Sequence, residues 1–228
     1  MNTLEEIIAW LKSQTNQKNL IGMARFGIVT DKAFGISMPV LREFAKTHRN
    51  QHKLAIELWQ SGYHEARILA TLIADPKQCT QELMDAWVVD FNSWDVCDQC
   101  CSNFFKKNAI AYKKALEWAE RDEEYVKRAG FTLMACLAVG DKKANDEAFY
   151  PFFDVIEKHS TDSRNFVRKA VNWALRQIGK RNKSLYPMAF QLSEKLIKSD
   201  NKTAQWIGKD AFKEFCKESI RERTLEKT

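Results

Sequence analysis

Apolar residues recur along most of the chain with the period of an α-helix. In "LEEIIAWL", Leu4, Ile7 and Leu11 fall on one stripe, the pattern of an amphipathic helix. The segments 52–61 ("HKLAIELWQS") and 115–138 ("ALEWAERDEEYVKRAGFTLMACLA") show the same period. No stretch alternates between apolar and polar residues with hairpin dipeptides at its ends, as paired strands would. The pattern therefore predicts an all-α protein.

The predicted helices also repeat. When "YVKRAGFTLMACL", "FVRKAVNWALRQI" and "WIGKDAFKEFCKE" are aligned, Arg128, Lys169 and Asp210 coincide at spacings of 41 residues. Arg67 and Asp98 take the same place upstream, at spacings of 31 and 30 residues. A period of ~40 residues is typical of HEAT-like helix pairs. We therefore expect an α-α superhelix of stacked pairs in which these five residues form a row along a concave, basic groove.

Composition supports this fold and suggests a partner. The 228 residues suit one domain spanning 1–228, and the 8 glycines and 4 prolines are too few for the turns of a β-protein. A net charge of +6 suits a polyanionic partner. Much of the positive charge lies in the segments 164–176 and 180–183, where a solvated helix face is the alternative explanation.

The N-terminal segment "MNTLEEIIAWLKSQ" carries two acids where a secretion signal has lysines. No apolar run approaches the ~20 residues that span a bilayer. We expect a cytoplasmic monomer with reduced thiols and no membrane association, located at the nucleoid when it is bound to DNA.

A candidate site arises from residues four positions apart. Trp94 and Asp98 lie on one helix face, and Trp173 shares a face with Lys169 in the same way. If the pairs stack as expected, two indoles and a carboxylate converge near Arg128. An indole face attracts a cation by ~0.5 to 2 kcal/mol, so such a site suits a cationic transition state. Alternatively, both tryptophans belong to the core and Asp98 caps a helix or pairs with Arg128.

These motifs resemble a known family. "SWDVCD", "VKRAGF" and "RKAVNWALRQIGK", together with "MARFGI" and "FGISMPVLREFAK" near the N-terminus, resemble the AlkD-like family of HEAT-repeat DNA glycosylases, which remove alkylated purines. The resemblance implies that Trp94 and Asp98 are the catalytic Trp and Asp. It implies that Arg128 is the active-site Arg and Trp173 the second active-site Trp. Phe26 stands where some members of the family carry Tyr.

The implied reaction is hydrolysis of the N-glycosidic bond of 3-methyladenine and 7-methylguanine in duplex DNA. The cationic purine departs as a neutral base, so the deoxyribose is the group that needs stabilisation, and Asp98 would supply it. No lysine is placed as a Schiff-base nucleophile, which implies a monofunctional enzyme that needs no cofactor. The residues that we expect to contact DNA are Phe26, Arg67, Arg168, Lys169, Arg176 and Lys180.

Other candidate groups are given structural roles. Cys97 and Cys100 form half of a zinc motif, but no second Cys or His pair follows at a suitable spacing, so we expect packing thiols and no metal. The four histidines, including His64, are scattered without a partner at useful spacing. Asp95 faces about 100° away from Trp94 on a helix and is expected to pair or cap.

Two other functions remain open. The same fold could serve as a DNA-binding or scaffold protein without the chemistry, or as a protein–protein adaptor.

Overall fold

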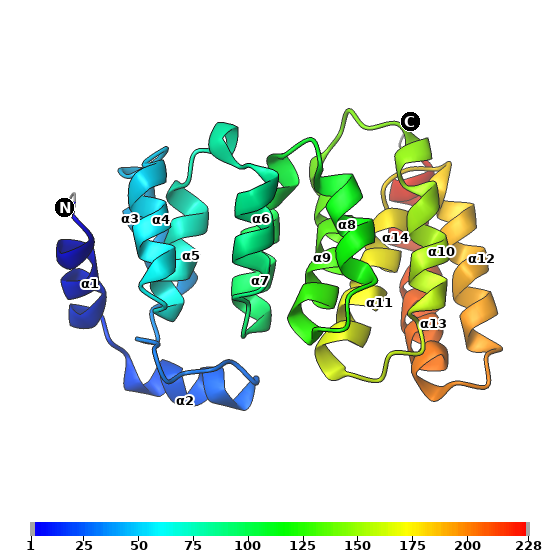
Figure 1. Cartoon of the computed structure of the whole chain (residues 1–228). Coiled ribbons are helices and arrows are strands. Elements are labelled where there is room, and N and C mark those ends of the chain that lie inside the picture. The colour runs from blue at the N-terminus through cyan, green and yellow to red at the C-terminus, as the bar shows by residue number, and fades with distance from the viewer. Residues whose placement is uncertain (1–2, 227–228) are drawn as a thin grey trace. The chain divides into compact units, whose positions relative to one another are not determined.

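The computed structural model describes residues 3–226, and every regular element among them is helical (Figure 1). The predicted all-α class is therefore confirmed. The α-helices are α1 (Leu4–Ser13), α2 (Gln17–Arg25), α3 (Met38–Lys46), α4 (His52–Gln60), α5 (His64–Ile73), α6 (Gln81–Val88), α7 (Trp94–Asn103), α8 (Ala111–Ala119), α9 (Glu124–Gly140), α10 (Tyr150–Lys158), α11 (Asn165–Gly179), α12 (Leu185–Ile197), α13 (Lys202–Phe215) and α14 (Glu218–Leu225). Short 3-10 helices are η1 (Pro76–Gln78), η2 (Phe105–Lys107) and η3 (Asp146–Ala148).

The helices group into two compact units that divide between Asn108 and Ala109. Unit 1 contains α1 to α7, and unit 2 contains α8 to α14. The expectation of one domain over the whole chain stays a prediction. Among the described residues, no helix combines the length and the apolar character needed to cross a membrane.

Aromatic stacking joins the helix pairs of unit 1. The rings of Trp59 on α4 and Trp87 on α6 stack 4.1 Å apart and almost parallel, at 1°. Phe91 lies edge-on to Trp59 with its centroid at 5.9 Å, and Phe104 lies 5.3 Å from Trp87. All four rings are buried, so the first helices of neighbouring pairs share one aromatic core.

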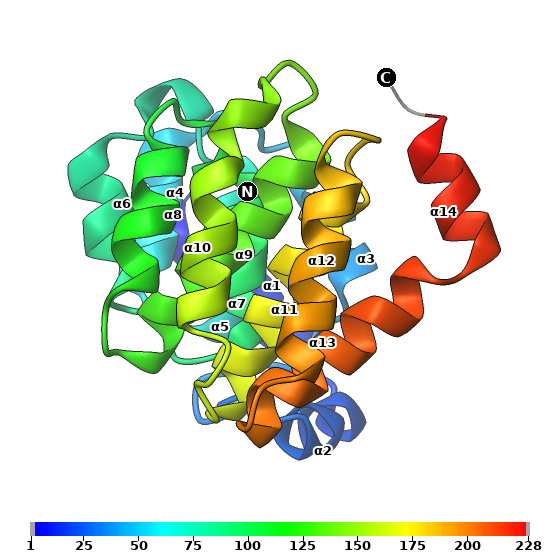
Figure 2. The ribbon, with the colours of Figure 1, turned by 90° about the vertical axis from the view of Figure 1, so that its right-hand side faces the viewer.

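Figure 2 shows the helices of unit 2. Within two of its pairs, α8 with α9 and α12 with α13, the helices approach closely at a glycine. A Cβ atom on Gly130 of α9 would lie only 2.5 Å from the backbone nitrogen of Ala119 on α8. On α13, a Cβ atom on Gly208 would lie 2.7 Å from the backbone nitrogen of Ile197 at the end of α12. A side chain at either position would force the two helices apart, which explains the glycine in the middle of a helix.

The predicted row of five residues falls on the second helix of each pair. Its members lie on α5, α7, α9, α11 and α13, which follow α4, α6, α8, α10 and α12 in turn. The structure thus confirms that the aligned residues lie on equivalent helices. The row consists of Arg67, Asp98, Arg128, Lys169 and Asp210.

The cysteines of α7 pack inside unit 1, as expected. Cys97, Cys100 and Cys101 have no exposed surface, and none forms a disulfide. Burial raises the pKa of the Cys100 thiol well above its usual range, an effect strengthened by the neighbouring thiol of Cys97. The Cys100 thiol therefore stays protonated, and all three buried thiols pack as small apolar groups.

Candidate functional site

The N-terminal half of α7 carries the central pair of the candidate site. Trp94 is the first residue of the helix, and Asp98 lies one turn later on the same face. Both side chains are half-buried rather than enclosed in the core. The preceding residue, Ser93, is fully buried with an extended backbone, and it fixes the point at which the helix begins. The Asp98 carboxylate thus lies on a helix face that reaches solvent.

Two hydrogen bonds fasten the segment after α2 to the start of α7. Trp94 Nε1 donates to the backbone oxygen of Phe26 over 3.1 Å. Val29 N donates to Ser93 Oγ, also over 3.1 Å. The first bond fixes the orientation of the indole. The Phe26 ring itself remains 71% exposed.

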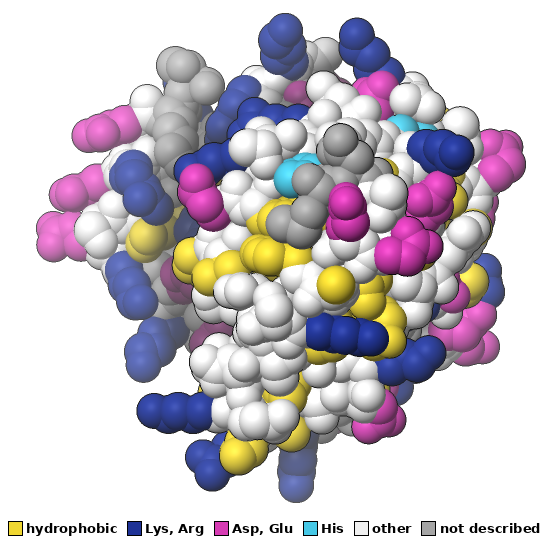
Figure 3. Space-filling view, turned by 90° about the vertical axis from the view of Figure 1, so that its left-hand side faces the viewer, with side chains coloured by type: hydrophobic (Ala, Val, Ile, Leu, Met, Phe, Trp, Pro, Cys, Tyr) yellow, Lys and Arg dark blue, Asp and Glu magenta, His cyan; other side chains and the backbone are white. Residues whose placement is uncertain are grey.

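Phe26 belongs to an exposed apolar surface that continues along α2. Ile21 is 59% and Val29 41% exposed, and Arg25 and Lys18 are exposed beside them. Figure 3 shows hydrophobic side chains together with lysine and arginine along the lower edge of this face of unit 1. Cations beside an exposed ring are suited to a nucleic-acid strand. The expectation that Phe26 contacts DNA stays a prediction.

A largely buried hydrogen bond ties α5 to the same turn of α7. His64 Nε2 lies 2.9 Å from Asp95 Oδ2, with side-chain exposures of 5% and 18%. The expectation that Asp95 pairs is confirmed, whereas the expectation that His64 lacks a partner is wrong. The spacing of 31 residues between them equals that between Arg67 and Asp98. The alignment of the repeats therefore places His64 and Asp95 at equivalent positions, and it could have indicated the pair.

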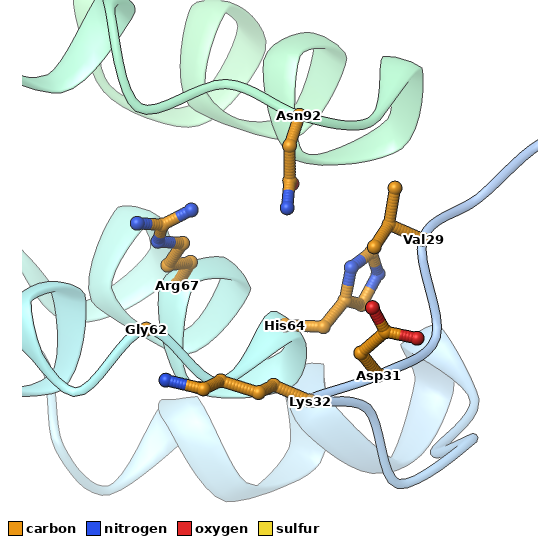
Figure 4. A pocket seen from close by; sticks show the side chains of 7 residues that line it. All are labelled: Val29, Asp31, Lys32, Gly62, His64, Arg67 and Asn92. Atoms are coloured by element: carbon orange, nitrogen blue, oxygen red, sulfur yellow. The ribbon is translucent and has the colours of Figure 1, made fainter.

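Arg67 is held in place on α5. Its Nη1 donates to the backbone oxygen of Asp90 over 2.8 Å, and its Nη2 lies 3.7 Å from the Asp90 carboxylate. The guanidinium also lies over the Trp59 ring, 5.4 Å from its centroid. It borders a pocket of about 210 Å³, and Figure 4 shows Arg67, His64 and Asn92 around a common space. Any contact of Arg67 with DNA is therefore made from a fixed position.

In unit 2, Arg128 joins α9 to the start of α11. Its side chain is 6% exposed, and Nη1 donates to the backbone oxygen of Phe166 over 2.6 Å. On α11, Lys169 is exposed and Trp173, one turn later, is half-buried. The expectation that Lys169 and Trp173 share a face is thus met within this helix.

Arg168 contacts a tryptophan that sequence reasoning missed. Its guanidinium lies 4.9 Å from the ring centroid of Trp206 on α13, and Trp206 is 37% exposed. Trp206 precedes Asp210 by four residues, as Trp94 precedes Asp98, so the repeated motif pointed to it. Arg168 therefore offers a cation that is oriented by an aromatic ring.

Acidic residues of α13 neutralise part of the positive charge of α11. Arg176 Nη1 lies 2.6 Å from Glu214, and Lys180 pairs with the same carboxylate. Burial raises the pKa of Glu214, but hydrogen bonds from Lys180 and Arg176 outweigh burial and hold that pKa below its ordinary value. Asp210 accepts from Asn172 over 2.7 Å and lies 3.6 Å from Arg176 Nε. Arg176 and Lys180 thus offer less charge to a ligand than Lys169 does.

Comparison with known proteins places these features in a family. No curated protein has a sequence that matches this chain. A solved structure aligns with 99% of this chain and 97% of its own, with a TM-score of 0.77 and 19% identity; it represents a family described as related to the HEAT-like repeat DNA glycosylases with affinity for branched DNA structures. The model of a family described as DNA alkylation repair enzyme matches residues 7–215. The chain belongs to the DNA alkylation repair enzyme family.

Proposed function

We propose that this protein binds duplex DNA and hydrolyses the N-glycosidic bond of cationic alkylated purines such as 3-methyladenine and 7-methylguanine. One observation carries the proposal: a half-buried carboxylate at Asp98 lies one turn from an indole, Trp94, whose orientation is fixed by a hydrogen bond. Membership of the DNA alkylation repair enzyme family supports alkylated DNA as the substrate. Phe26 and the cations Arg168 and Lys169 are candidates for contacts with the DNA.

The chemistry follows from where charge develops. An alkylated purine is already cationic and leaves as a neutral base, so the deoxyribose gains positive charge in the transition state. A carboxylate ~4 Å away stabilises such a charge by ~4 kcal/mol at an effective dielectric of 20. An indole face adds ~0.5 to 2 kcal/mol. At ~1.36 kcal/mol per factor of ten, these groups account for a roughly 10³- to 10⁴-fold acceleration.

Each residue then has one role. Asp98 stabilises the sugar cation and orients or deprotonates the attacking water. Trp94 and Trp173 contact the sugar through their ring faces. Arg128 positions the DNA backbone next to that sugar. Because the carboxylate rather than a lysine acts on the sugar, the strand stays intact after the base has left.

The test is release of 7-methylguanine from methylated duplex DNA. We expect the wild type to release the base and Asp98→Asn to lose about 10²- to 10⁴-fold in rate, with unchanged folding and DNA affinity. Asp154→Asn is the matched control because Asp154 is an exposed carboxylate on α10, the first helix of its pair. Equal activity of Asp98→Asn and the wild type would contradict the mechanism.

A second candidate function is binding of branched DNA without base excision. The description of the structural relative, with its affinity for branched DNA, favours it. It predicts tighter binding of a four-way junction than of a linear duplex of equal length, and no base release by the wild type. If the affinity for the junction or for the linear duplex falls steeply with salt, DNA rather than a protein is supported as the partner.

A further inference from the structure

A second positively charged feature lies at the other end of the α9 and α11 helices. A pocket of about 370 Å³ is bordered by the C-terminal part of α9, the loop after it, the end of α11, and α14. Four of the described side chains that line it are cationic and none is acidic. The cations are Lys142, Lys180, Arg181 and Arg223.

Arg181 is the fixed element of this pocket. Its Nη1 donates to the backbone oxygen of Ala138 over 3.0 Å, and its Nη2 donates to that of Ala144 over 2.8 Å. The guanidinium lies 4.5 Å from the ring centroid of Phe149. Its Nε is buried and has no hydrogen-bond partner among the described residues. The backbone therefore holds this guanidinium at the pocket, and none of the described carboxylates forms an ion pair with it.

Two exposed cations add net positive charge to the pocket. Lys142 and Arg223 are exposed, and neither forms an ion pair with another residue of the described chain. Lys180 shares the single carboxylate of Glu214 with Arg176. The positive charge around the pocket thus exceeds the negative charge that is paired with it.

The nearby acids are engaged elsewhere or face away. The Asp141 carboxylate accepts backbone N–H groups of Lys143 and Ala144, each over 3.1 Å, and the Tyr112 hydroxyl over 3.2 Å. Burial is the main cause that raises the pKa of Tyr112, so the hydroxyl keeps its proton and continues to donate. Glu222 precedes Arg223 on α14 and is turned about 100° around the helix. Lys142, Arg181 and Arg223 therefore repel one another unless an anion joins them.

We propose that this pocket binds a phosphate group, from either a nucleic-acid backbone or a free polyphosphate. Guanidinium and ammonium groups bind phosphate oxygens through strong, charge-assisted hydrogen bonds. The volume lies within the ~300 to 1,000 Å³ that is usual for ligand pockets. Val139, which lines the pocket, follows Arg128 on α9 by 11 residues, or about 16 Å of helix. The site is thus separate from Arg128 and goes beyond the proposed base excision.

Calorimetric titration with inorganic tripolyphosphate tests the site. Removing Lys142 and Arg223 together as K142A/R223A takes away two exposed cations and leaves the buried contacts of Arg181 intact. We expect tripolyphosphate affinity to fall about tenfold or more, as expected for lost hydrogen bonds to a charged group. The control K12A/R42A removes the same charge from exposed positions on α1 and α3 and should leave the affinity unchanged.

A second arm identifies the source of the phosphate. If the ligand is a nucleic-acid backbone, K142A/R223A also weakens binding of a linear DNA duplex, and the slope of log affinity against log salt decreases by about 1 to 2. If the ligand is a free polyphosphate, DNA affinity stays at the level of the control while tripolyphosphate binding is lost. Either result supports the site. Absence of tripolyphosphate binding by the wild type, or equal losses in both double variants, overturns it.

Discussion

His64 Nε2 lies 2.9 Å from Asp95 Oδ2 and so joins the first residue of α5 to the first turn of α7. The pair is largely buried and stands beside Trp94. Because a buried partner is costly to lose, we expect His64→Ala to lower the free energy of unfolding by about 1 to 3 kcal/mol. Urea denaturation measures this. Gln60→Ala, at an exposed position on α4, should stay within about 0.5 kcal/mol of the wild type.

The bond between Trp94 and the Phe26 carbonyl predicts a graded effect on base release. Trp94→Phe keeps an aromatic face but removes the N–H that donates over 3.1 Å. We expect it to lower the release rate of 7-methylguanine by less than Trp94→Ala does, because part of the ring interaction remains. Trp10→Phe, on α1 with its ring stacked on Phe44, serves as the control and should leave the rate unchanged. Equal rates for both Trp94 variants would argue against a role for the ring.

We expect the replacement of one carboxylate oxygen of Glu65 by an NH₂ group to lower the stability of the fold strongly. Its carboxylate has no exposed surface and accepts the backbone N–H groups of Phe34, Gly35 and Ile36 over 2.9, 2.7 and 3.2 Å. In Glu65→Gln, an amide NH₂ group replaces one of the two oxygens that accept these bonds. That NH₂ group then faces a backbone N–H, and the two donors cannot bond to each other. We expect a loss of about 1 to 3 kcal/mol in the free energy of unfolding. An unchanged urea midpoint would show that the loop is held by other contacts.

We expect the ion pairs of Glu214 to stabilise the fold at neutral pH and to lose this effect in acid. Its pKa is lowered in the folded protein from an ordinary value of 4.5, despite burial, by hydrogen bonds from Lys180 and Arg176. A lowered carboxyl pKa stabilises the fold above the unfolded value and ceases to do so as pH falls through the folded value. The difference in unfolding free energy between the wild type and Glu214→Gln should therefore be greatest above pH 4.5 and shrink below it. A difference that is constant across this range contradicts the assignment.

The thiols predict a selective labelling pattern. Burial raises the pKa of Cys79 to about 11, against a weaker opposing effect of Asn108, and it also raises the pKa of Cys100 well above its usual range. Cys216 is exposed. Because the thiolate is the reactive form, iodoacetamide at neutral pH should label Cys216 and spare the buried cysteines of the native protein. Mass spectrometry of proteolytic peptides measures this, and labelling of Cys97 or Cys101 without unfolding contradicts it.

The helices and their register were predictable because both depend on local periodicity. The alignment that placed Arg128, Lys169 and Asp210 together located three second helices correctly. The same spacing contained the His64–Asp95 pair, which went unnoticed because the histidines were considered one at a time. Contacts between residues in neighbouring repeats can thus be found once the period is known.

Two features could not be found in this way. The segment between α2 and α3 has no periodicity, and distant side chains hold it: Glu65, Ser93 and Trp94. The positive charge of α11 was visible in the sequence, but Glu214, which neutralises part of it, lies 38 residues beyond Arg176. In both cases the deciding partner comes from another helix, and local composition does not indicate which side chains it will meet.

The hydrogen bond from Trp94 to Phe26 also couples an outer surface to an inner one. The Phe26 ring projects into solvent while its own carbonyl restrains the indole. A molecule that shifts the backbone at Phe26 must either carry the indole with it or break this hydrogen bond. A ligand on the outer surface at α2 can therefore reach Trp94 through the backbone of Phe26, without touching the indole.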